Sequence, residues 1–191
     1  MTSLFSWRGR LLAALVGSLG LLAAGCGGKS DGADADGKVL LRNDFDNLAG
    51  WLGTAPQPSL TRERAHSGQY SIKVDANTEF SLGYASTLGQ MSEERITKIK
   101  VDAWVLAPNA EAGGLLVTHV GDAPPATKPM LWDGFDVVQA ANQKYGDWAH
   151  VSKVIDIPAE ANANTNFGIY LWRNKGNATT YIDDLVITVA P

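Results

Sequence analysis

Residues 97–106 read Thr-Lys-Ile-Lys-Val-Asp-Ala-Trp-Val-Leu, and this stretch decides the fold. Apolar and polar side chains alternate along it, which is typical of a β-strand with one buried face. Ile99, Val101, Ala103 and Val105 fall on one side of such a strand. We therefore expect these four side chains to contribute to a hydrophobic core.

The opposite side of the same strand carries Lys100, Asp102 and Trp104. An indole that stands among charged side chains leaves a large apolar surface in water, so its position requires an explanation. Trp104 either stacks on a ligand or packs beneath a long loop. The sequence leaves both explanations open.

Short alternating stretches recur on both sides of residues 97–106, and Gly, Pro and Asn residues separate them. Only Ser92 to Ile96 has the character of a helical turn. The pattern predicts an all-β fold, an antiparallel β-sandwich in one domain. The ten predicted strands are Val39 to Phe45, Ser59 to Arg64, Tyr70 to Val74, Phe80 to Ser86, Thr97 to Leu106, Gly114 to Val120, Met130 to Val137, Val151 to Ile157, Asn166 to Trp172 and Thr180 to Val189.

The strand from Asn166 to Trp172 repeats the alternation. Phe167, Ile169 and Leu171 are expected inside, which puts Tyr170 and Trp172 on the outer side. Exposed aromatic rings flanked by hydrogen-bonding groups suit a sugar, because a pyranose ring has an apolar face for stacking and a rim of hydroxyls.

Trp104 and Trp172 are therefore the first candidates for a sugar-binding platform, and Trp132 is the third, although alternation does not decide its face. Trp51 and Trp148 lie in loops and are expected to pack against the ends of the sandwich. The candidate polar partners of a sugar are Asp102, Lys100, Asp133, Tyr170 and Arg173, each of which can also be an ordinary solvated side chain.

Five stretches of the chain form a recognisable series: Asn43-Asp44-Phe45-Asp46 followed by Gly50-Trp51, then 65–74, Val101-Asp102-Ala103-Trp104-Val105, Gly146-Asp147-Trp148 and Tyr181-Ile182-Asp183-Asp184-Leu185. In this order they resemble the galactose-binding-like jelly rolls, and in particular the carbohydrate-binding modules of families 4/9 and 22. The resemblance implies a jelly-roll fold and carbohydrate binding. The same superfamily also contains protein-binding and structural members, so fold does not decide function.

The resemblance also implies a structural Ca²⁺ between the first and last strands. Asp46 and Asp184 would offer carboxylates, and Asp183 and Ser67 would offer backbone oxygens. These are the hard oxygen ligands that Ca²⁺ requires. The alternative is that one aspartate is solvated while the other caps a bulge.

The N-terminal segment reads as an export signal. Arg8 and Arg10 precede an uncharged stretch from Leu11 to Gly25, which is too short to cross a membrane comfortably. Leu22-Ala23-Ala24-Gly25-Cys26 resembles the lipobox of bacterial lipoproteins, which implies cleavage before Cys26 and lipidation of its thiol.

Three segments follow from this interpretation: a signal peptide at 1–25, a lipidated Cys26 with a tether to residue 38, and a jelly-roll domain at 39–191. Residues 27–38 contain no apolar side chain larger than alanine and cannot bury a face. The expected location is the bacterial cell envelope, on the outer membrane or the cell surface, with the protein held by its lipid anchor.

Composition and motifs exclude several functions. With 16 Lys and Arg against 20 Asp and Glu, the chain lacks the excess of cations that nucleic-acid binding requires. Cys26 is the only cysteine, so the chain can form no internal disulfide. The sequence contains no H-E-x-x-H, G-x-S-x-G, P-loop or G-x-G-x-x-G motif.

The sequence therefore favours a non-catalytic, membrane-anchored protein that binds a polysaccharide or oligosaccharide. A structural or protein-interaction subunit of an envelope complex is the alternative. A small polysaccharide-cleaving enzyme is the third hypothesis, since such an enzyme needs only two suitably placed carboxylates.

Overall fold

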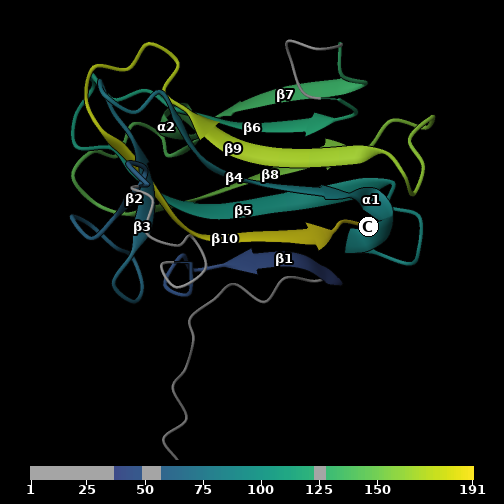
Figure 1. Cartoon of the computed structure of the whole chain (residues 1–191). Coiled ribbons are helices and arrows are strands. Elements are labelled where there is room, and N and C mark those ends of the chain that lie inside the picture. The colour runs from purple at the N-terminus through teal and green to yellow at the C-terminus, as the bar shows by residue number, and fades with distance from the viewer. Residues whose placement is uncertain (1–36, 49–56, 123–127) are drawn as a thin grey trace, which may run out of the picture. The chain divides into compact units, whose positions relative to one another are not determined.

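The computed structural model describes residues 37–48, 57–122 and 128–191, and strands dominate this part of the chain (Figure 1). The strands are β1 (Val39–Asn43), β2 (Leu60–Thr61), β3 (Ser71–Val74), β4 (Phe80–Thr87), β5 (Lys98–Leu106), β6 (Leu115–Val120), β7 (Leu131–Asp136), β8 (Ala149–Asp156), β9 (Asn166–Trp172) and β10 (Thr180–Val189), and the helices are α1 (Leu88–Met91) and α2 (Val137–Ala140).

The strands form two antiparallel sheets. Sheet 1 has the order β2-β3-β10-β5-β8, with β1 also paired to β10, and sheet 2 has the order β4-β9-β6-β7. Most neighbouring strands are far apart in sequence, as in a jelly roll, whereas the pairs β2–β3 and β6–β7 are consecutive. The prediction of an all-β antiparallel sandwich is confirmed.

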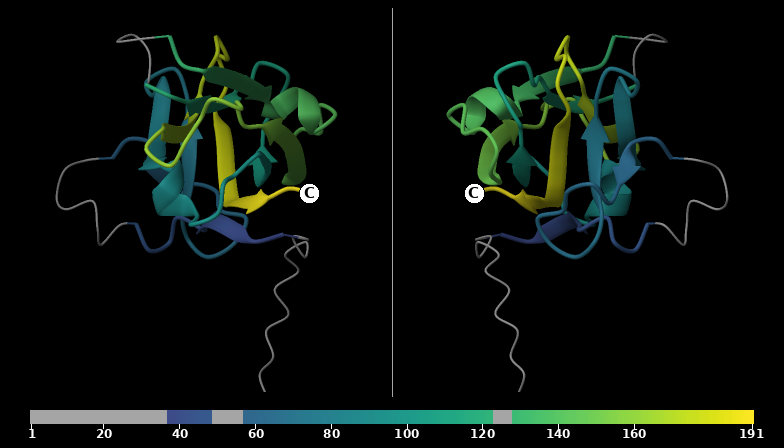
Figure 2. Two further views of the ribbon diagram at one scale, coloured as in Figure 1. Left: turned by 90° about the vertical axis from the view of Figure 1, so that its right-hand side faces the viewer. Right: turned by 90° about the vertical axis from the view of Figure 1, so that its left-hand side faces the viewer.

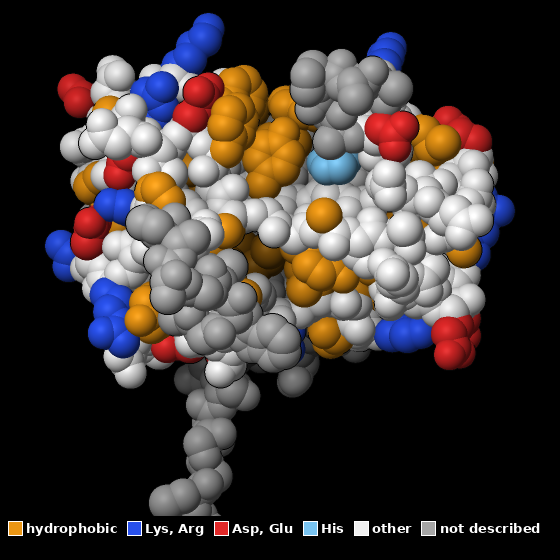
Figure 3. Space-filling model, viewed as in Figure 1, with side chains coloured by type: hydrophobic (Ala, Val, Ile, Leu, Met, Phe, Trp, Pro, Cys, Tyr) orange, Lys and Arg blue, Asp and Glu red, His pale blue; other side chains and the backbone are white. Residues whose placement is uncertain are grey.

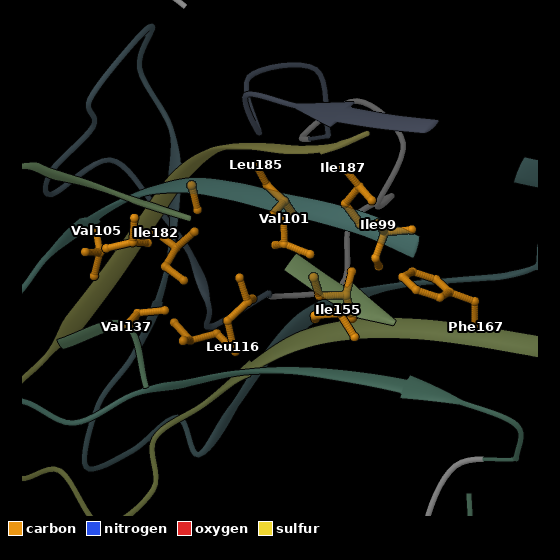
Figure 4. Close-up of a cluster of buried hydrophobic side chains, with 14 of the residues drawn as sticks. Ile99, Val101, Val105, Leu116, Val137, Ile155, Phe167, Ile182, Leu185 and Ile187 are labelled. Carbon is orange, nitrogen blue, oxygen red and sulfur yellow. The ribbon is translucent and has the colours of Figure 1, made fainter. Parts of the chain in front are cut away.

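The core lies between the two sheets (Figure 4). Ile99, Val101, Ala103 and Val105 of β5 are each at most 1% exposed, so the predicted inner face of this strand is confirmed. The predicted inner residues of β9 are buried to the same degree. Burial of a large aliphatic side chain contributes roughly 1.5–3 kcal/mol, so these strands account for much of the stability.

Strand β10 contains a β-bulge, and its pairing changes from β3 to β1 around this point. Its first residues pair with β3 and its later residues with β1, while its register against β5 shifts between Asp183 and Val186. Asp184 has a φ of 47°, in the left-handed region. Such a bulge re-aims side chains. Here the fully buried Asp183 stands opposite Trp104 of β5.

The predicted helical turn at Ser92 to Ile96 is wrong, because the helical residues are those of α1, immediately before it. The predicted strand ending at Val137 stops one residue earlier. The Asp136 carboxylate accepts a hydrogen bond from the Gln139 backbone N–H at 2.9 Å and begins α2 instead.

Both helices of the described residues have four residues, and neither is long and apolar enough to span a membrane. In Figure 1, and again in Figure 2 after a 90° turn, α1 and α2 lie far apart. The outer surfaces of both sheets are therefore left without a covering helix.

Candidate functional site

The outer side of sheet 2 carries a group of aromatic side chains from three strands. Phe80 of β4 stacks against Trp172 of β9, with ring centroids 6.2 Å apart and an interplanar angle of 13°. Tyr170, two residues before Trp172, meets Phe80 edge-on at 6.0 Å. Trp132 of β7 stands at 74° to Trp172 with centroids 6.4 Å apart. We call Phe80, Trp132, Tyr170 and Trp172 the aromatic face.

Glycines on the same side of sheet 2 make room for these rings. A Cβ atom at Gly134 would lie 2.8 Å from Cη2 of Trp132, so this indole lies directly over the glycine. A Cβ atom at Gly168 would overlap the imidazole of His119 in the same way. Because these glycines have no side chain, the rings of Trp132 and His119 can lie directly against the backbone of the sheet.

Two of the four rings of the aromatic face are open to solvent, whereas Tyr170 and Trp172 are half-buried. Phe80 is 53% exposed and Trp132 is 43% exposed, which is unusual for side chains of this size. Figure 3 shows hydrophobic side chains gathered over β9 and β4 of Figure 1. The indoles of Trp132 and Trp172 are nearly perpendicular, so they form two surfaces at an angle rather than one flat surface. Such a shape can accommodate a single chain of sugar rings.

Few polar groups are fixed around the aromatic face. The indole N–H of Trp172 donates to Oε1 of Glu79 at 3.3 Å, which orients this ring. His119 is 8% exposed, and its Nδ1 lies 3.3 Å from the carbonyl oxygen of Gly121. The Glu79 carboxylate therefore stands beside Trp172, where it can reach the hydroxyl groups of a sugar, whereas the imidazole of His119 is buried.

The outer side of sheet 1 also presents a tryptophan, but a loop covers it. The imidazole of His66 stacks on Trp104 at 3.8 Å with an interplanar angle of 14°, and Trp148 meets His66 edge-on at 5.7 Å. The predicted packing role of Trp148 agrees with this contact. Trp104 is half-buried beneath His66 rather than open as a platform.

The predicted polar partners beside Trp104 pair with each other. Nζ of Lys100 lies 3.1 Å and Nε2 of His150 lies 3.2 Å from Oδ1 of Asp102. Asp102 is 7% exposed even though it points outward. These groups form a local ionic cluster on sheet 1.

The structure therefore separates the predicted site into two. The prediction that one platform contains both Trp104 and Trp172 is wrong, because β5 and β9 belong to different sheets and their outer sides face apart. Trp132, Tyr170 and Trp172 come together on sheet 2.

Two predicted polar partners lie elsewhere. Asp133 turns away from the aromatic face toward β8, where its carboxylate contacts Nζ of Lys153 at 2.7 Å. Nη1 of Arg173 donates to the carbonyl oxygen of Gly176 at 3.1 Å, and this bond fixes the loop that follows β9. Both side chains are engaged in contacts that hold the fold.

Sequence reasoning missed Phe80, His119 and the outward glycines. Phe80 was placed in a strand, but its face depended on a bulge, because the register between β4 and β9 shifts between Phe80 and Gly83. The one available signal was the glycine at alternate positions with aromatic residues, as in Trp132-Asp133-Gly134.

The four residues of the predicted Ca²⁺ site lie in one neighbourhood. The Ser67 hydroxyl donates to Oδ1 of Asp184 at 2.7 Å, and Oδ1 of Asp46 accepts from the Gln69 backbone N–H at 2.8 Å. Oδ2 of Asp46 is buried and lacks a hydrogen-bond partner in the described chain. Asp183 completes the group from β10.

Protein donors occupy most of these oxygens. Oδ2 of Asp183 accepts from the backbone N–H groups of His66 and Ser67, and Asp184 accepts from His66 and Ser67 side chains. Within residues 37–48, 57–122 and 128–191, no cluster of three or more His, Cys, Asp or Glu is arranged to hold a metal ion. As placed, the residues form a hydrogen-bonded network, and Ca²⁺ binding stays a prediction.

Burial raises the pKa of the Asp183 carboxyl to about 6, although the backbone N–H groups of Ser67, His66 and Asp184 act in the opposite direction. The carboxyl therefore titrates in a mildly acidic range. The same carboxyl accepts a hydrogen bond from the backbone N–H of His66, the residue that stacks on Trp104.

Trp51 and Cys26 lie outside the described residues, together with the signal peptide and most of the tether. Their interpretations stay predictions.

No protein-family model and no curated protein matches the chain. Solved structures do. The chain is similar to the C-terminal family 22 carbohydrate-binding module of Clostridium thermocellum xylanase 10B, at 17% identity and a TM-score of 0.53 over 82% of this chain and 96% of that one.

A xylan-binding domain of family 22 matches at 16% identity and a TM-score of 0.52, over 82% of this chain and 97% of that one. The N-terminal modules of the same Clostridium thermocellum xylanase, complexed with xylohexaose, match at 17% identity and a TM-score of 0.51, over 82% of this chain and 29% of that one. At these identities the comparisons establish the fold: the domain is a jelly-roll β-sandwich of the kind found in family 22 carbohydrate-binding modules.

Proposed function

We propose that this protein binds a neutral polysaccharide chain, without catalysis, on the aromatic face. The observation that carries the proposal is the gathering of Phe80, Trp132, Tyr170 and Trp172 on one open sheet surface. Each indole can stack under the apolar face of one sugar ring, and the 74° angle between Trp132 and Trp172 suits a twisted single chain. Solved neighbours of this fold are xylan-binding domains, so xylan is the first ligand to test.

The affinity expected for a polysaccharide follows from the number of sugar rings that stack on the aromatic face. By analogy with bases stacked on aromatic side chains, each stack contributes about 1–3 kcal/mol. Two stacks with a few hydrogen bonds give a dissociation constant between about 1 μM and 1 mM. Such weak binding is sufficient for a protein held near its ligand by a membrane anchor.

Calorimetric titration of the full chain with xylohexaose, backed by a glycan array, tests the proposal. Trp172→Ala and Trp132→Ala should each weaken binding by about 5- to 150-fold, because each removes one stack. Trp104→Phe is the matched control, since it changes an aromatic side chain on the other sheet and retains a ring against His66. Binding that survives both alanine substitutions would refute the aromatic face as the site.

A chain that binds no glycan on the array would instead favour the protein-interaction hypothesis. Slow release of reducing ends from a bound polysaccharide would favour an enzyme. Several solved structures to which the chain is similar are carbohydrate-binding modules, which supports binding without cleavage.

We further propose that Cys26 carries a lipid that holds the domain in the bacterial envelope. The lipobox-like residues before Cys26 support this. Expression of the full chain in a bacterium with radioactive palmitate should label the wild type and leave Cys26→Ser unlabelled. Equal labelling of both forms would refute lipidation at this cysteine.

A further inference from the structure

Strand β4 forms one edge of sheet 2, and in the described part of the chain it pairs with β9 alone. In Figure 1 it lies on the opposite side of β9 from β6 and β7. Its residues, Phe-Ser-Leu-Gly-Tyr-Ala-Ser-Thr, include no charged side chain and no proline. An unpaired strand edge exposes backbone N–H and C=O groups with which another strand can pair, and charges or prolines normally discourage this. Strand β4 lacks both.

The other edges of the two sheets carry such protection. Asp133 of β7 and Lys153 of β8 contact each other at 2.7 Å, so each of these two edge strands has a charged side chain at its middle. Strand β2 has only two residues, and β1 carries the exposed Arg42. Short strands and charged side chains both discourage pairing with another chain. Among the described edges, β4 is therefore the one most open to a further strand.

Backbone hydrogen bonds show which groups of β4 are free. The carbonyl oxygen of Asn166, opposite Thr87, accepts from the backbone N–H of Gly121 at 2.8 Å, so Asn166 is turned toward β6 and away from β4. Backbone groups alternate in direction along an antiparallel strand. Gly83 and Ala85 lie an even number of positions before Thr87, so their N–H and C=O groups point away from β9. Both residues are exposed, and the register with β9 is regular from Gly83 to Thr87.

The free backbone groups of Gly83 and Ala85 are complementary to a second copy of themselves. When two β4 strands run antiparallel about a two-fold axis at Tyr84, Gly83 of each copy lies opposite Ala85 of the other. The residues of such a pair exchange both of their backbone hydrogen bonds. Every free N–H and C=O group of Gly83 and Ala85 is then paired. The side chains at both positions are small, so the second strand can approach closely.

The side chain of Tyr84 favours the same symmetric arrangement. Tyr84 stands opposite Ile169 of β9 and is half-buried. At the two-fold axis it faces its own copy in a pair without mutual backbone hydrogen bonds, where the two Cα atoms are only about 4.5 Å apart. Aromatic side chains that lie directly opposite each other on neighbouring strands stabilise the pairing. The partner's ring therefore covers surface that one copy leaves in water.

An apolar recess continues this edge toward β1. Its volume is about 140 Å³, and Leu41, Leu48 and Leu82 are half-buried beside Tyr84 in its lining. None of the residues that line the recess is charged. The whole chain has a net charge of -4, so two copies repel each other on average. An uncharged surface does not add to this repulsion, and its apolar side chains suit an identical surface.

We propose that the chain forms a two-fold symmetric dimer in which β4 pairs with β4 of a second copy. Sheet 2 then continues from one copy into the other. The axis that relates two antiparallel strands is perpendicular to the sheet, so both aromatic faces lie on the same side. If the aromatic face binds a polysaccharide as proposed above, one long chain meets two sites and is held more tightly than by one. The dimer itself does not depend on that function.

Sedimentation velocity of the full chain at increasing protein concentration tests the proposal. Cys26→Ser serves as the parent protein, because it excludes lipidation and disulfides as causes of association. The parent should pass from monomer to dimer. Ala85→Pro removes the outward N–H from both copies and should weaken the dimer by about tenfold or more. Proline is tolerated on an edge strand where its nitrogen faces solvent, so the fold should be retained.

Ser152→Pro is the matched control, at the edge of β8. The backbone N–H of Ile157 donates to the carbonyl oxygen of Thr97 at 2.9 Å. By the same alternation, the N–H of the exposed Ser152 points away from β5. The control therefore makes the same backbone change at a charged edge, and it should dimerise as the parent does.

Tyr84→Cys in the same parent gives a second measurement that involves no proline. Oxidised glutathione should convert this variant into a disulfide-linked dimer, because the two Cα atoms at the axis lie within the reach of a disulfide. Ser152→Cys is its control and should remain without an inter-chain disulfide under the same conditions.

A parent that stays monomeric at every concentration overturns the proposal and leaves the β4 edge to a segment of another protein. A dimer that Ala85→Pro leaves intact, or that Ser152→Pro disrupts equally, also overturns it. Equal cross-linking of Tyr84→Cys and Ser152→Cys contradicts the pairing about Tyr84. None of these measurements requires a glycan, so their failure is distinct from a failure of xylohexaose to bind.

Discussion

The outer sides of the two sheets present tryptophans in very different environments. On sheet 2, Trp132 is exposed, and Trp172 is half-buried in contact with both Trp132 and Phe80. On sheet 1, the outward Trp104 lies under His66 at 3.8 Å. Strand alternation predicted an outward direction for both Trp104 and Trp172. Whether an outward ring is available to a ligand depends on loops that come from distant parts of the chain.

The cover over Trp104 is anchored by two adjacent aspartates. Asp183 accepts from the His66 backbone N–H at 2.7 Å, and Asp184 contacts Nδ1 of His66 at 2.6 Å. Sheet 2 has no equivalent anchored cover among the described residues. Within the described part of the chain, the outer side of sheet 1 is thus covered by packing, and the outer side of sheet 2 is the surface that we propose for binding.

The largest expected effect is on stability, from Trp104→Ala. This variant should lose about 2–4 kcal/mol of the free energy of unfolding, because it removes a half-buried ring and its stack with His66. Urea denaturation of the full chain measures it. Trp132→Ala should cost less, since its ring is 43% exposed. Loss of glycan binding in Trp104→Ala with unchanged stability would reverse the roles assigned to the two faces.

The Ca²⁺ prediction concerns the same anchored cover. If Ca²⁺ binds near Asp46, Asp183 and Asp184, excess chelator should lower the Tm by about 5–10 °C, which corresponds to about 2–3 kcal/mol for a site that is saturated. Calcium-saturated chelator serves as the control for ionic strength. An unchanged Tm would show that the hydrogen-bonded network holds the cover without a metal.

The expected effect that is confined to the narrowest range of conditions is the pH dependence that arises from Asp183. Its pKa is raised from 3.8 to about 6, so the native state binds a proton more tightly than the unfolded chain does. The resulting stabilisation is fully present below about pH 4 and is lost as the pH rises through 6. Asp183→Asn, which cannot ionise, should flatten the slope of unfolding free energy between pH 4 and 6. An identical slope in both proteins would contradict this assignment.

Local patterns in the sequence were sufficient for the strands and for the core side of β5 and β9. Alternation of period two determines which side of a strand a residue occupies, and it put Val101 and Ile169 inside. It failed where the backbone departs from regularity. The bulge near Phe80 is a shift of register between β4 and β9. The start of α2 depends on one hydrogen bond to the Asp136 carboxylate. Alternation of apolar and polar residues encodes neither feature.

The candidate site was only half predictable for a related reason. Trp172 and Tyr170 were placed correctly on one outer side, but pairing either with Trp104 required the order of strands in each sheet. That order joins residues more than one hundred positions apart, as in the contact between His66 and Asp184. Sequence spacing carries no information about such contacts.

The sequence by itself determined that this protein has an all-β domain with alternating strands, with aromatic side chains directed outward from them. These properties follow from backbone geometry and burial of apolar surface, which act over a few residues. The tertiary structure alone decided which outward rings meet and which of them a loop covers. Those outcomes depend on strand order and long-range hydrogen bonds, which exist only in the folded chain.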